Sequence, residues 1–230
     1  MKFDQVRRIV GATPYMAQDE AWELYHFILE NRPRRVLELG HAHGVSSLYM
    51  AAALDELSEG TLDTVDIRNS AARVPNIEEL LAQANLVGRV RVHREQSSYT
   101  WFLKKQIETQ DRPIYDFCFI DGPKNWTIDG LAFFLVDRLL REGGWILFDD
   151  YGWTHAKHVG REATDGISIR SLSEDEINTP QIEAVFRLLV MRHPSYSNFK
   201  LQDGWWAWAQ KRADGPRDLV IGKKRLSSSS

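Results

Sequence analysis

Short apolar segments alternate with helical ones from Arg35 to Phe148, and this alternation constrains the fold more than any other feature of the chain. The apolar runs predict strands at residues 35–39, 61–67, 89–93, 115–120 and 145–148. Apolar residues at helical spacing predict helices at residues 18–29, 46–57, 76–85, 99–109 and 129–140. Strand–helix units of this length predict a parallel sheet with helices on both faces.

The C-terminal third departs from this alternation. Its expected elements are a loop or lid, a helix and two strands, at residues 161–177, 180–192, 199–202 and 205–210. The two strands are joined by Asp203-Gly204, a typical hairpin turn. We therefore expect an α/β protein with a Rossmann-like, seven-stranded, mostly parallel sheet and an antiparallel C-terminal strand.

Length and composition favour one domain. The chain has 230 residues, of which 43% are hydrophobic, enough for one sizeable core. We expect an N-terminal helical cap over residues 1–33, a Rossmann-like core over 34–212 and a tail over 213–230. A homo-oligomer is left open.

Net charge and the pattern of apolar residues argue against nucleic acid and membranes as partners. The net charge of −3 gives no general attraction for nucleic acid. No apolar run reaches the roughly 20 residues that span a bilayer, so no membrane partner is expected. The charged N-terminus does not resemble a signal peptide, and the single cysteine, Cys118, cannot form an internal disulfide. These features together predict a cytoplasmic protein.

A glycine-containing turn lies between the first expected strand and the following helix. Gly40 and Gly44 allow close approach of a ligand to the backbone, and the helix N-terminus adds N–H groups and partial positive charge. Pyrophosphate sites use G-x-G-x-x-G, whereas this turn reads G-x-x-x-G with His41 and His43 inside it. This spacing disfavours an NAD-dependent oxidoreductase and favours a smaller anion, such as the carboxylate of a methionine moiety. The glycines alone are equally consistent with a tight turn.

Asp66 lies at the end of the second expected strand, 22 residues beyond Gly44. A carboxylate at this place can accept hydrogen bonds from both hydroxyls of a ribose. In register with Glu38 and the glycine turn, it predicts a nucleoside-type cofactor.

Residues 36–47, VLELGHAHGVSS, resemble the first motif of class I S-adenosylmethionine-dependent methyltransferases. The likeness is to the catechol-type group and to the related sugar and macrolide O-methyltransferases, and it extends over residues 11–211. The resemblance implies S-adenosylmethionine as cofactor and an antiparallel last strand. It also implies a set of cofactor-binding residues: Glu38, Gly40 and Ser46 around the methionine part, Asp66 at the ribose, Ser97 near the adenine, and residues 13–16 closing over the methionine end. Gly44, Asp121 and His41 are further expected cofactor-binding residues, with the His41 side chain packed beside the cofactor.

Three carboxylates follow the fourth and fifth expected strands. Asp121 follows the fourth, and Asp149 and Asp150 follow the fifth. Because the carboxyl ends of neighbouring parallel strands share one crevice, these side chains would repel each other without a cation between them. Mg²⁺ suits such oxygen ligands, and the divalent-metal O-methyltransferases carry acidic residues at these positions. The alternative is that the pair caps the next segment and that Asp121 begins a turn.

Lys124 stands three residues after Asp121, where catechol-type enzymes carry a lysine that acts as the base. A lysine can remove a proton only if its pKa is lowered, and nearby carboxylates raise it. Lys124 is therefore a candidate for the catalytic base beside Asp121, or a charge partner of the carboxylates. His155 and His158 are alternative bases or solvated loop residues.

The combined interpretation is a methyltransferase that transfers a methyl group to a hydroxyl of a small molecule with the help of Mg²⁺. Two alternatives stay open. One is a metal-independent N- or O-methyltransferase, and the other is a nucleoside-binding module without catalysis.

Overall fold

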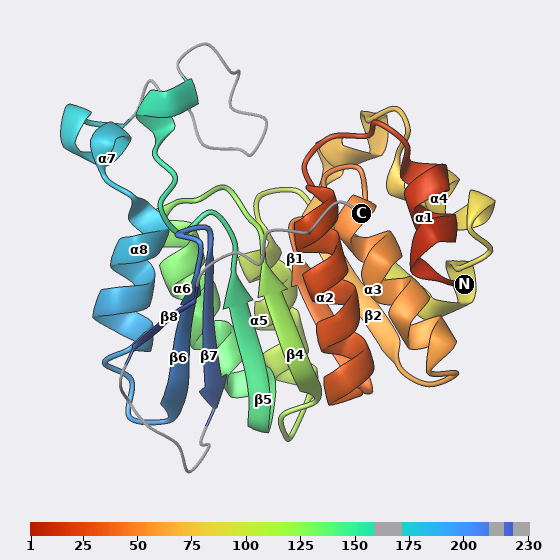
Figure 1. Ribbon diagram of the computed structural model, residues 1–230. Helices are drawn as coiled ribbons and strands as arrows, with labels where there is room; N and C mark the ends of the chain where they lie inside the picture. The colour runs from red at the N-terminus through yellow and green to blue at the C-terminus, as the bar shows by residue number, and fades with distance from the viewer. Residues whose placement is uncertain (159–171, 212–218, 223–230) are drawn as a thin grey trace.

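The computed structural model describes residues 1–158, 172–211 and 219–222. Within them, eight strands form one sheet in the order β3-β2-β1-β4-β5-β7-β6-β8 (Figure 1). The strands are β1 Arg35–Leu39, β2 Thr61–Ile67, β3 Val90–Glu95, β4 Tyr115–Ile120, β5 Leu140–Phe148, β6 Tyr196–Gln202, β7 Trp206–Lys211 and β8 Val220–Gly222. Strands β1 to β5 are parallel, and β7 runs antiparallel to both β5 and β6.

This architecture confirms the expected Rossmann-like α/β fold with an antiparallel strand near the C-terminus. The sheet has one strand more than the seven expected, because β8 pairs in parallel with β6. Val220 and Ile221 are exposed, so β8 is held by backbone pairing and has no buried side chains that would mark it in the sequence. It lies within residues 213–230, where we expected a tail.

Helices cover both faces of the sheet (Figure 1). They are α1 Phe3–Val10, α2 Gln18–Asn31, α3 Val45–Glu56, α4 Ile77–Gln83, α5 Tyr99–Thr109, α6 Trp126–Leu139, α7 Glu174–Asn178 and α8 Gln181–Val185, with short 3-10 turns η1 Arg68–Ala72, η2 Val87–Arg89 and η3 His155–His158 and a π-helical turn η5 Phe186–Val190. Of these, α1 to α4 pack on one face, and α5, α6 and α8 pack on the other. Among the described residues, no helix combines the length and the apolar character that crossing a membrane requires.

Side chains of β4 alternate between the two faces and join both cores. Phe117 and Phe119 pack with α2 and α3, whereas Cys118 and Ile120 pack with α5 and α6. Burial raises the pKa of the Cys118 thiol well above its usual range, which keeps it protonated. The central place of this strand and its inert cysteine follow from its apolar sequence.

The segment expected as a loop or lid is only partly described, since 161–171 lie outside the described residues. Its end was predicted wrongly, because residues 174–178 form helix α7. A capping box starts this helix: the Ser173 hydroxyl accepts from the Glu176 N–H, and the Glu176 carboxylate accepts from the Ser173 N–H. The helix expected at 180–192 is present as α8 followed by the π-helical turn.

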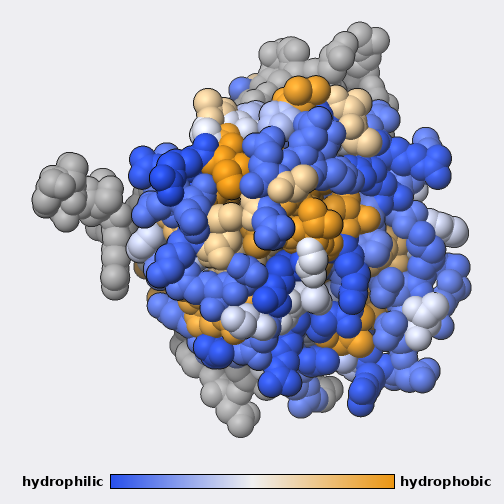
Figure 2. All heavy atoms as spheres, turned by 90° about the vertical axis from the view of Figure 1, so that its right-hand side faces the viewer, coloured by the Kyte–Doolittle hydropathy of each residue, from blue (hydrophilic) through white to orange (hydrophobic). Residues whose placement is uncertain are grey.

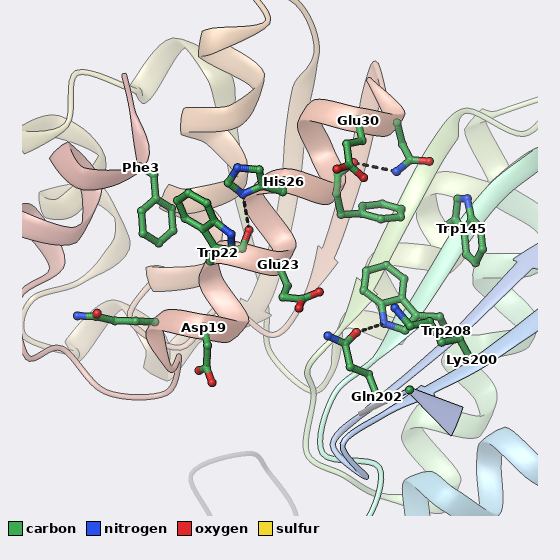
Figure 3. A pocket seen from close by; sticks show the side chains of 14 residues that line it. Phe3, Asp19, Trp22, Glu23, His26, Glu30, Trp145, Lys200, Gln202 and Trp208 are labelled. Atoms are coloured by element: carbon green, nitrogen blue, oxygen red, sulfur yellow. Dashed lines mark hydrogen bonds between the residues drawn. The ribbon is translucent and has the colours of Figure 1, made fainter. Parts of the chain in front are cut away.

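The cap formed by α1 and α2 leaves one side of the sheet partly uncovered. Figure 2 shows the molecule from the side of α1 and α4, where hydrophilic side chains dominate and apolar ones gather near the middle. A groove of about 1160 Å³ lies between α2 and strands β5, β7 and β6, with Trp22 and His26 on one wall and Trp145 and Trp208 on the other (Figure 3).

Candidate active site

A pocket opens at the carboxyl ends of the central strands. We call it the cradle pocket, and it is lined by Gly40, Ala42, Asp66, Ile67, Arg73, Ser97, Ser98, Tyr99, Asp121, Gly122, Pro123 and Ile128. Four residues expected at a cofactor site therefore lie around one space, namely Gly40, Asp66, Ser97 and Asp121. Their places follow from β1, β2, β3 and β4 all ending at the same edge of the sheet.

Two glycines shape the turn beside this pocket, and one of them, Gly40, lines it. Gly40 has φ 96° and Gly44 has φ 92°, values that side chains rarely allow. A Cβ on Gly40 would lie 2.1 Å from the carbonyl oxygen of Asp121, and one on Gly44 would lie 2.5 Å from Cγ1 of Ile77. The turn thus brings β1 against the end of β4 and starts α3 at Val45.

The carboxylate of Asp66 holds the glycine turn. Its Oδ2 accepts from the backbone N–H groups of His41 at 3.1 Å and Ala42 at 2.8 Å, and its Oδ1 accepts from that of Ile67 at 2.6 Å. A carboxylate offers about four acceptor positions, so capacity for a ligand hydroxyl remains. Asp66 faces the pocket as expected, and its contact with ribose stays a prediction.

Glu38 and Ser46 lie beneath the turn and do not line the cradle pocket. Glu38 is fully buried and accepts from the hydroxyls of Ser46 at 2.5 Å, Thr64 at 2.6 Å and Ser47. Burial raises the pKa of Glu38 to about 7, although the three hydroxyl donors favour its charged form. Their direct role at a cofactor stays a prediction.

His41 extends this set of hydrogen bonds to Ser70, which is also buried. Its Nδ1 lies 3.2 Å from the Thr64 hydroxyl, and its Nε2 lies 3.1 Å from that of Ser70. Burial lowers the pKa of His41 to about 4, so the ring is neutral at physiological pH, with one nitrogen donating and the other accepting. The side chain of His41 therefore supports the turn from below. The ring of Tyr15, in the segment expected to close over the site, stacks on His43 at 5.8 Å.

The carboxylates expected to share a crevice do so. Oxygen atoms of Asp121, Asp149 and Asp150, which we call the carboxylate cluster, all lie within 4.8 Å of one another. The Lys124 ammonium contacts Asp121 and lies 3.3 Å from Oδ2 of Asp150 and 3.7 Å from Oδ2 of Asp149. The sequence thus predicted correctly which four side chains meet here.

The backbone at this cluster is strained in two places. Lys124 has φ 60° and Asp150 has φ 56°, in the left-handed region. Such conformations cost about 1–3 kcal/mol each and gather at functional sites. Burial alone would lower the pKa of Lys124, but the three carboxylates outweigh burial and hold it well above its usual range. This geometry agrees with the charge-partner alternative for Lys124.

Other side chains at the site were not predicted from the sequence. Tyr99 donates from its hydroxyl to the buried Asp129, whose other oxygen accepts from the Asn125 N–H at 2.6 Å. A Cβ on Gly122 would lie 2.0 Å from the Tyr99 hydroxyl, so the pocket wall requires a glycine there. Tyr99 is the first residue of a helix, and nothing in its local sequence marks such a role.

Two further aromatic groups come from segments beside β5, and one of them contacts the cluster. Trp206 is buried and donates from Nε1 to Oδ1 of Asp149 at 2.7 Å. His155 is also buried, with its ring edge-on to Trp153 at 4.6 Å, so it is not the solvated loop residue that was one of its two expected roles. Its role as a base stays a prediction.

Comparison with known proteins bears on this site. A family model described as a methyltransferase domain matches residues 37–151, which include the glycine turn and the carboxylate cluster. No curated protein sequence matches the chain.

Solved structures share the fold over nearly the whole chain. An O-methyltransferase from Bacillus cereus in complex with SAH has 23% identity and a TM-score of 0.63, with 91% of this chain and 90% of that one covered. TomG, an O-methyltransferase from Streptomyces achromogenes in complex with SAM, has 17% identity and a TM-score of 0.61, with 92% and 89% covered. The SAH-bound methyltransferase PaMTH1 from Podospora anserina has 16% identity and a TM-score of 0.63, with 92% and 86% covered.

At these identities the TM-scores show a shared fold alone, and the family match is what assigns the chain to a family. The family match confirms the methyltransferase expected from the sequence, and the solved structures confirm the expected fold. The chain belongs to the methyltransferase domain family.

Proposed function

We propose that this chain is an S-adenosylmethionine-dependent O-methyltransferase that acts on a hydroxyl of a small molecule and uses a divalent cation, Mg²⁺, to orient it. The observation that carries the proposal is that Asp121 belongs to two sites at once. Its backbone closes the cradle pocket against Gly40, and its carboxylate belongs to the carboxylate cluster. A methyl donor in the first site and an acceptor at the second would therefore be neighbours.

The cradle pocket fits a nucleoside-type cofactor. Asp66 offers carboxylate oxygens to ribose hydroxyls, and Ser97 offers a hydroxyl. Pro123 and Ile128 supply apolar surface for the adenine ring. The N-terminus of α3 at Gly44 carries partial positive charge that suits the carboxylate of a methionine moiety. S-adenosylmethionine bound there would supply a methyl group on a positively charged sulfur. The similar structure from Bacillus cereus is a complex with SAH, the product of this cofactor, and the one from Streptomyces achromogenes is a complex with SAM.

The carboxylate cluster fits a divalent cation. Its donor atoms are carboxylate oxygens, the ligands that Mg²⁺ prefers, and three carboxylates carry more formal charge than Lys124 neutralises. Asp121, Asp149 and Asp150 would hold the ion, which would orient an acceptor hydroxyl and lower its pKa. Holding a nucleophile in line with the methyl group accounts for much of the rate in such reactions.

Lys124 is the proposed general base, or the group that positions the base. Its amine can accept a proton only when neutral, and the surrounding carboxylates favour the ammonium. In the arrangement described, the ammonium holds Asp121 and Asp150 in place. The variant Lys124→Arg separates the two roles, because arginine preserves the charge and cannot act as a base.

The chain is also proposed to act as one domain. Phe3, Val6 and Leu24 of the cap helices belong to the same hydrophobic core as Phe117 and Phe119 of the sheet. Separating the cap from the sheet would expose both sets of side chains.

Methyl transfer from labelled S-adenosylmethionine to a panel of hydroxylated acceptors tests the proposal, with Mg²⁺ and with EDTA. We expect transfer that EDTA abolishes, and loss of transfer in Asp150→Ala with unchanged affinity for S-adenosylmethionine by calorimetry. Transfer that survives both changes would establish the metal-independent alternative. Tight cofactor binding without transfer to any acceptor would favour the binding module.

A further inference from the structure

Trp206 touches the carboxylate cluster from a strand that supplies none of its acidic residues. The antiparallel pairing of β7 with β5 places Ala207 opposite Phe148, so Trp206 lies level with Asp149. The Trp206 side chain is 2% exposed, and its Nε1 lies 2.7 Å from Oδ1 of Asp149.

This hydrogen bond gives the two carboxylate oxygens of Asp149 different partners. Oδ1 accepts from the indole, and Oδ2 lies 3.7 Å from the Lys124 ammonium, inside the cluster. The backbone of Asp149 is also held, because its N–H donates to the Ile120 carbonyl at 3.0 Å. Both the backbone and the side-chain rotamer of this residue are therefore fixed by neighbours.

The indole itself has little freedom to move. Its ring packs edge-on against Phe119 at 6.1 Å and Trp208 at 5.8 Å. An indole N–H can only donate, so it stabilises Asp149 as an acceptor and cannot reverse the direction of the bond. A rigid donor of this kind selects one orientation of the carboxylate.

We propose that Trp206 is a positioning residue that turns one oxygen of Asp149 toward the proposed cation and keeps the other out of reach. The inference rests on the proposed cation site and deepens it. Outer-shell partners that orient a metal ligand typically change metal affinity 10–100-fold when removed. Trp206 would thus determine how tightly the cluster binds a cation, without touching the cation or the substrate.

Trp208 provides a matched control. It lies two residues further along β7, is 5% exposed and belongs to the same core. Its Nε1 also donates a hydrogen bond, at 3.2 Å, but to Oε1 of Gln202 beside the groove (Figure 3). Replacing either tryptophan by phenylalanine removes one indole N–H and similar ring area, but only the replacement of Trp206 removes the donor to Asp149.

The experiment measures Mg²⁺ affinity by calorimetry on the full chain, with thermal unfolding recorded in parallel. We expect Trp206→Phe to weaken Mg²⁺ binding about 10-fold or more and to leave S-adenosylmethionine affinity unchanged, whereas Trp208→Phe leaves both unchanged at a similar loss of thermal stability. Equal Mg²⁺ affinity in the two variants would overturn the role of Trp206 and leave the cation site intact. A wild-type chain that binds no Mg²⁺ would overturn both.

A second measurement keeps Trp206 in place and so does not depend on folding of Trp206→Phe. In the ¹⁵N-labelled wild-type chain, the indole N–H signal of Trp206 should move as Mg²⁺ is added, and that of Trp208 should stay in place. Asp149→Asn should shift the Trp206 signal without Mg²⁺. A Trp206 signal that saturating Mg²⁺ leaves unmoved contradicts the inference.

Discussion

The cradle pocket and the carboxylate cluster lie next to each other, but their negative charges are balanced differently. In and below the cradle, Asp66 accepts three backbone N–H groups and Glu38 accepts three hydroxyls, all from the chain itself. In the cluster, three carboxylates gather around the Lys124 ammonium, and their formal charge exceeds that of the lysine. In the first region, the folded chain itself supplies the donors that the carboxylates need. In the second, the chain supplies less positive charge than the carboxylates carry, which suits a bound cation.

Gly40→Ala should give the largest effect, because Gly40 joins the two regions. Its new Cβ would lie 2.1 Å from the backbone oxygen of Asp121, so the backbone itself must move. We expect a loss of more than about 4 kcal/mol in the free energy of unfolding and no measurable binding of S-adenosylmethionine.

Gly143→Ala is the matched control for this change. Gly143 has φ 77°, and in the described part of the chain no atom lies within 4 Å of the place that its Cβ would take. Only the left-handed backbone should be penalised, by about 1 kcal/mol. Equal losses of stability in the two variants, by urea denaturation, would show that the contact with Asp121 does not matter.

Glu38→Gln tests whether the hydroxyl donors around Glu38 fully compensate for the burial of its negative charge. The pKa of Glu38 is raised to about 7 in the folded chain, so the folded state binds a proton that the unfolded state has released between its ordinary pKa of 4.5 and pH 7. Wild-type stability should therefore fall, relative to the glutamine variant, as the pH rises through this window. The change should be about 3 kcal/mol, since each pKa unit corresponds to about 1.4 kcal/mol.

Chemical denaturation at several pH values measures this difference. Glu30→Gln, at an exposed position on α2, serves as the control and should keep the wild-type pH dependence. If Glu38→Gln also keeps it, burial does not destabilise the Glu38 carboxylate as described.

Added Mg²⁺ tests the other side of the comparison. A ligand that binds the folded chain alone stabilises it by about 2.7 kcal/mol at 100 times its Kd. We expect the free energy of unfolding to rise by that amount in the wild type and to be unchanged in Asp150→Asn, measured by denaturation with Mg²⁺ or with EDTA. Stabilisation that persists in the variant would place the ion elsewhere.

Asp66→Asn should give the smallest effect. The amide keeps one oxygen acceptor for the turn but replaces the other with a donor. We expect binding of S-adenosylmethionine to weaken about 10-fold, equivalent to about 1.4 kcal/mol, while Mg²⁺ affinity stays the same. A parallel loss of Mg²⁺ affinity would mean that the two regions are not separate.

The sequence predicts the fold well where apolar patterns reflect burial. Strand β4 and helix α5 begin and end where expected, because their buried residues set the pattern. Helix α6 starts three residues earlier than expected, since the Asn125 side chain accepts from the N–H groups of Thr127 and Ile128 and caps it. Strand β8 has exposed side chains and left no such pattern.

The site is predictable where it depends on strand ends and unpredictable where it depends on side-chain direction. The meeting of Asp121, Asp149 and Asp150 follows from parallel strands ending at one edge. The burial of Glu38 under hydroxyls from α3 and β2, and the bond from Trp206 to Asp149, depend on rotamers and on contacts far apart in the sequence. No local pattern encodes such contacts.

The most direct test of the central claim is a crystal structure of the chain with SAH and Mn²⁺, recorded at a wavelength that reveals manganese by anomalous scattering. The account predicts one strong anomalous peak bounded by carboxylate oxygens of Asp121, Asp149 and Asp150. A cluster without a peak, with the Lys124 ammonium still among the three carboxylates and SAH in the cradle pocket, would contradict it.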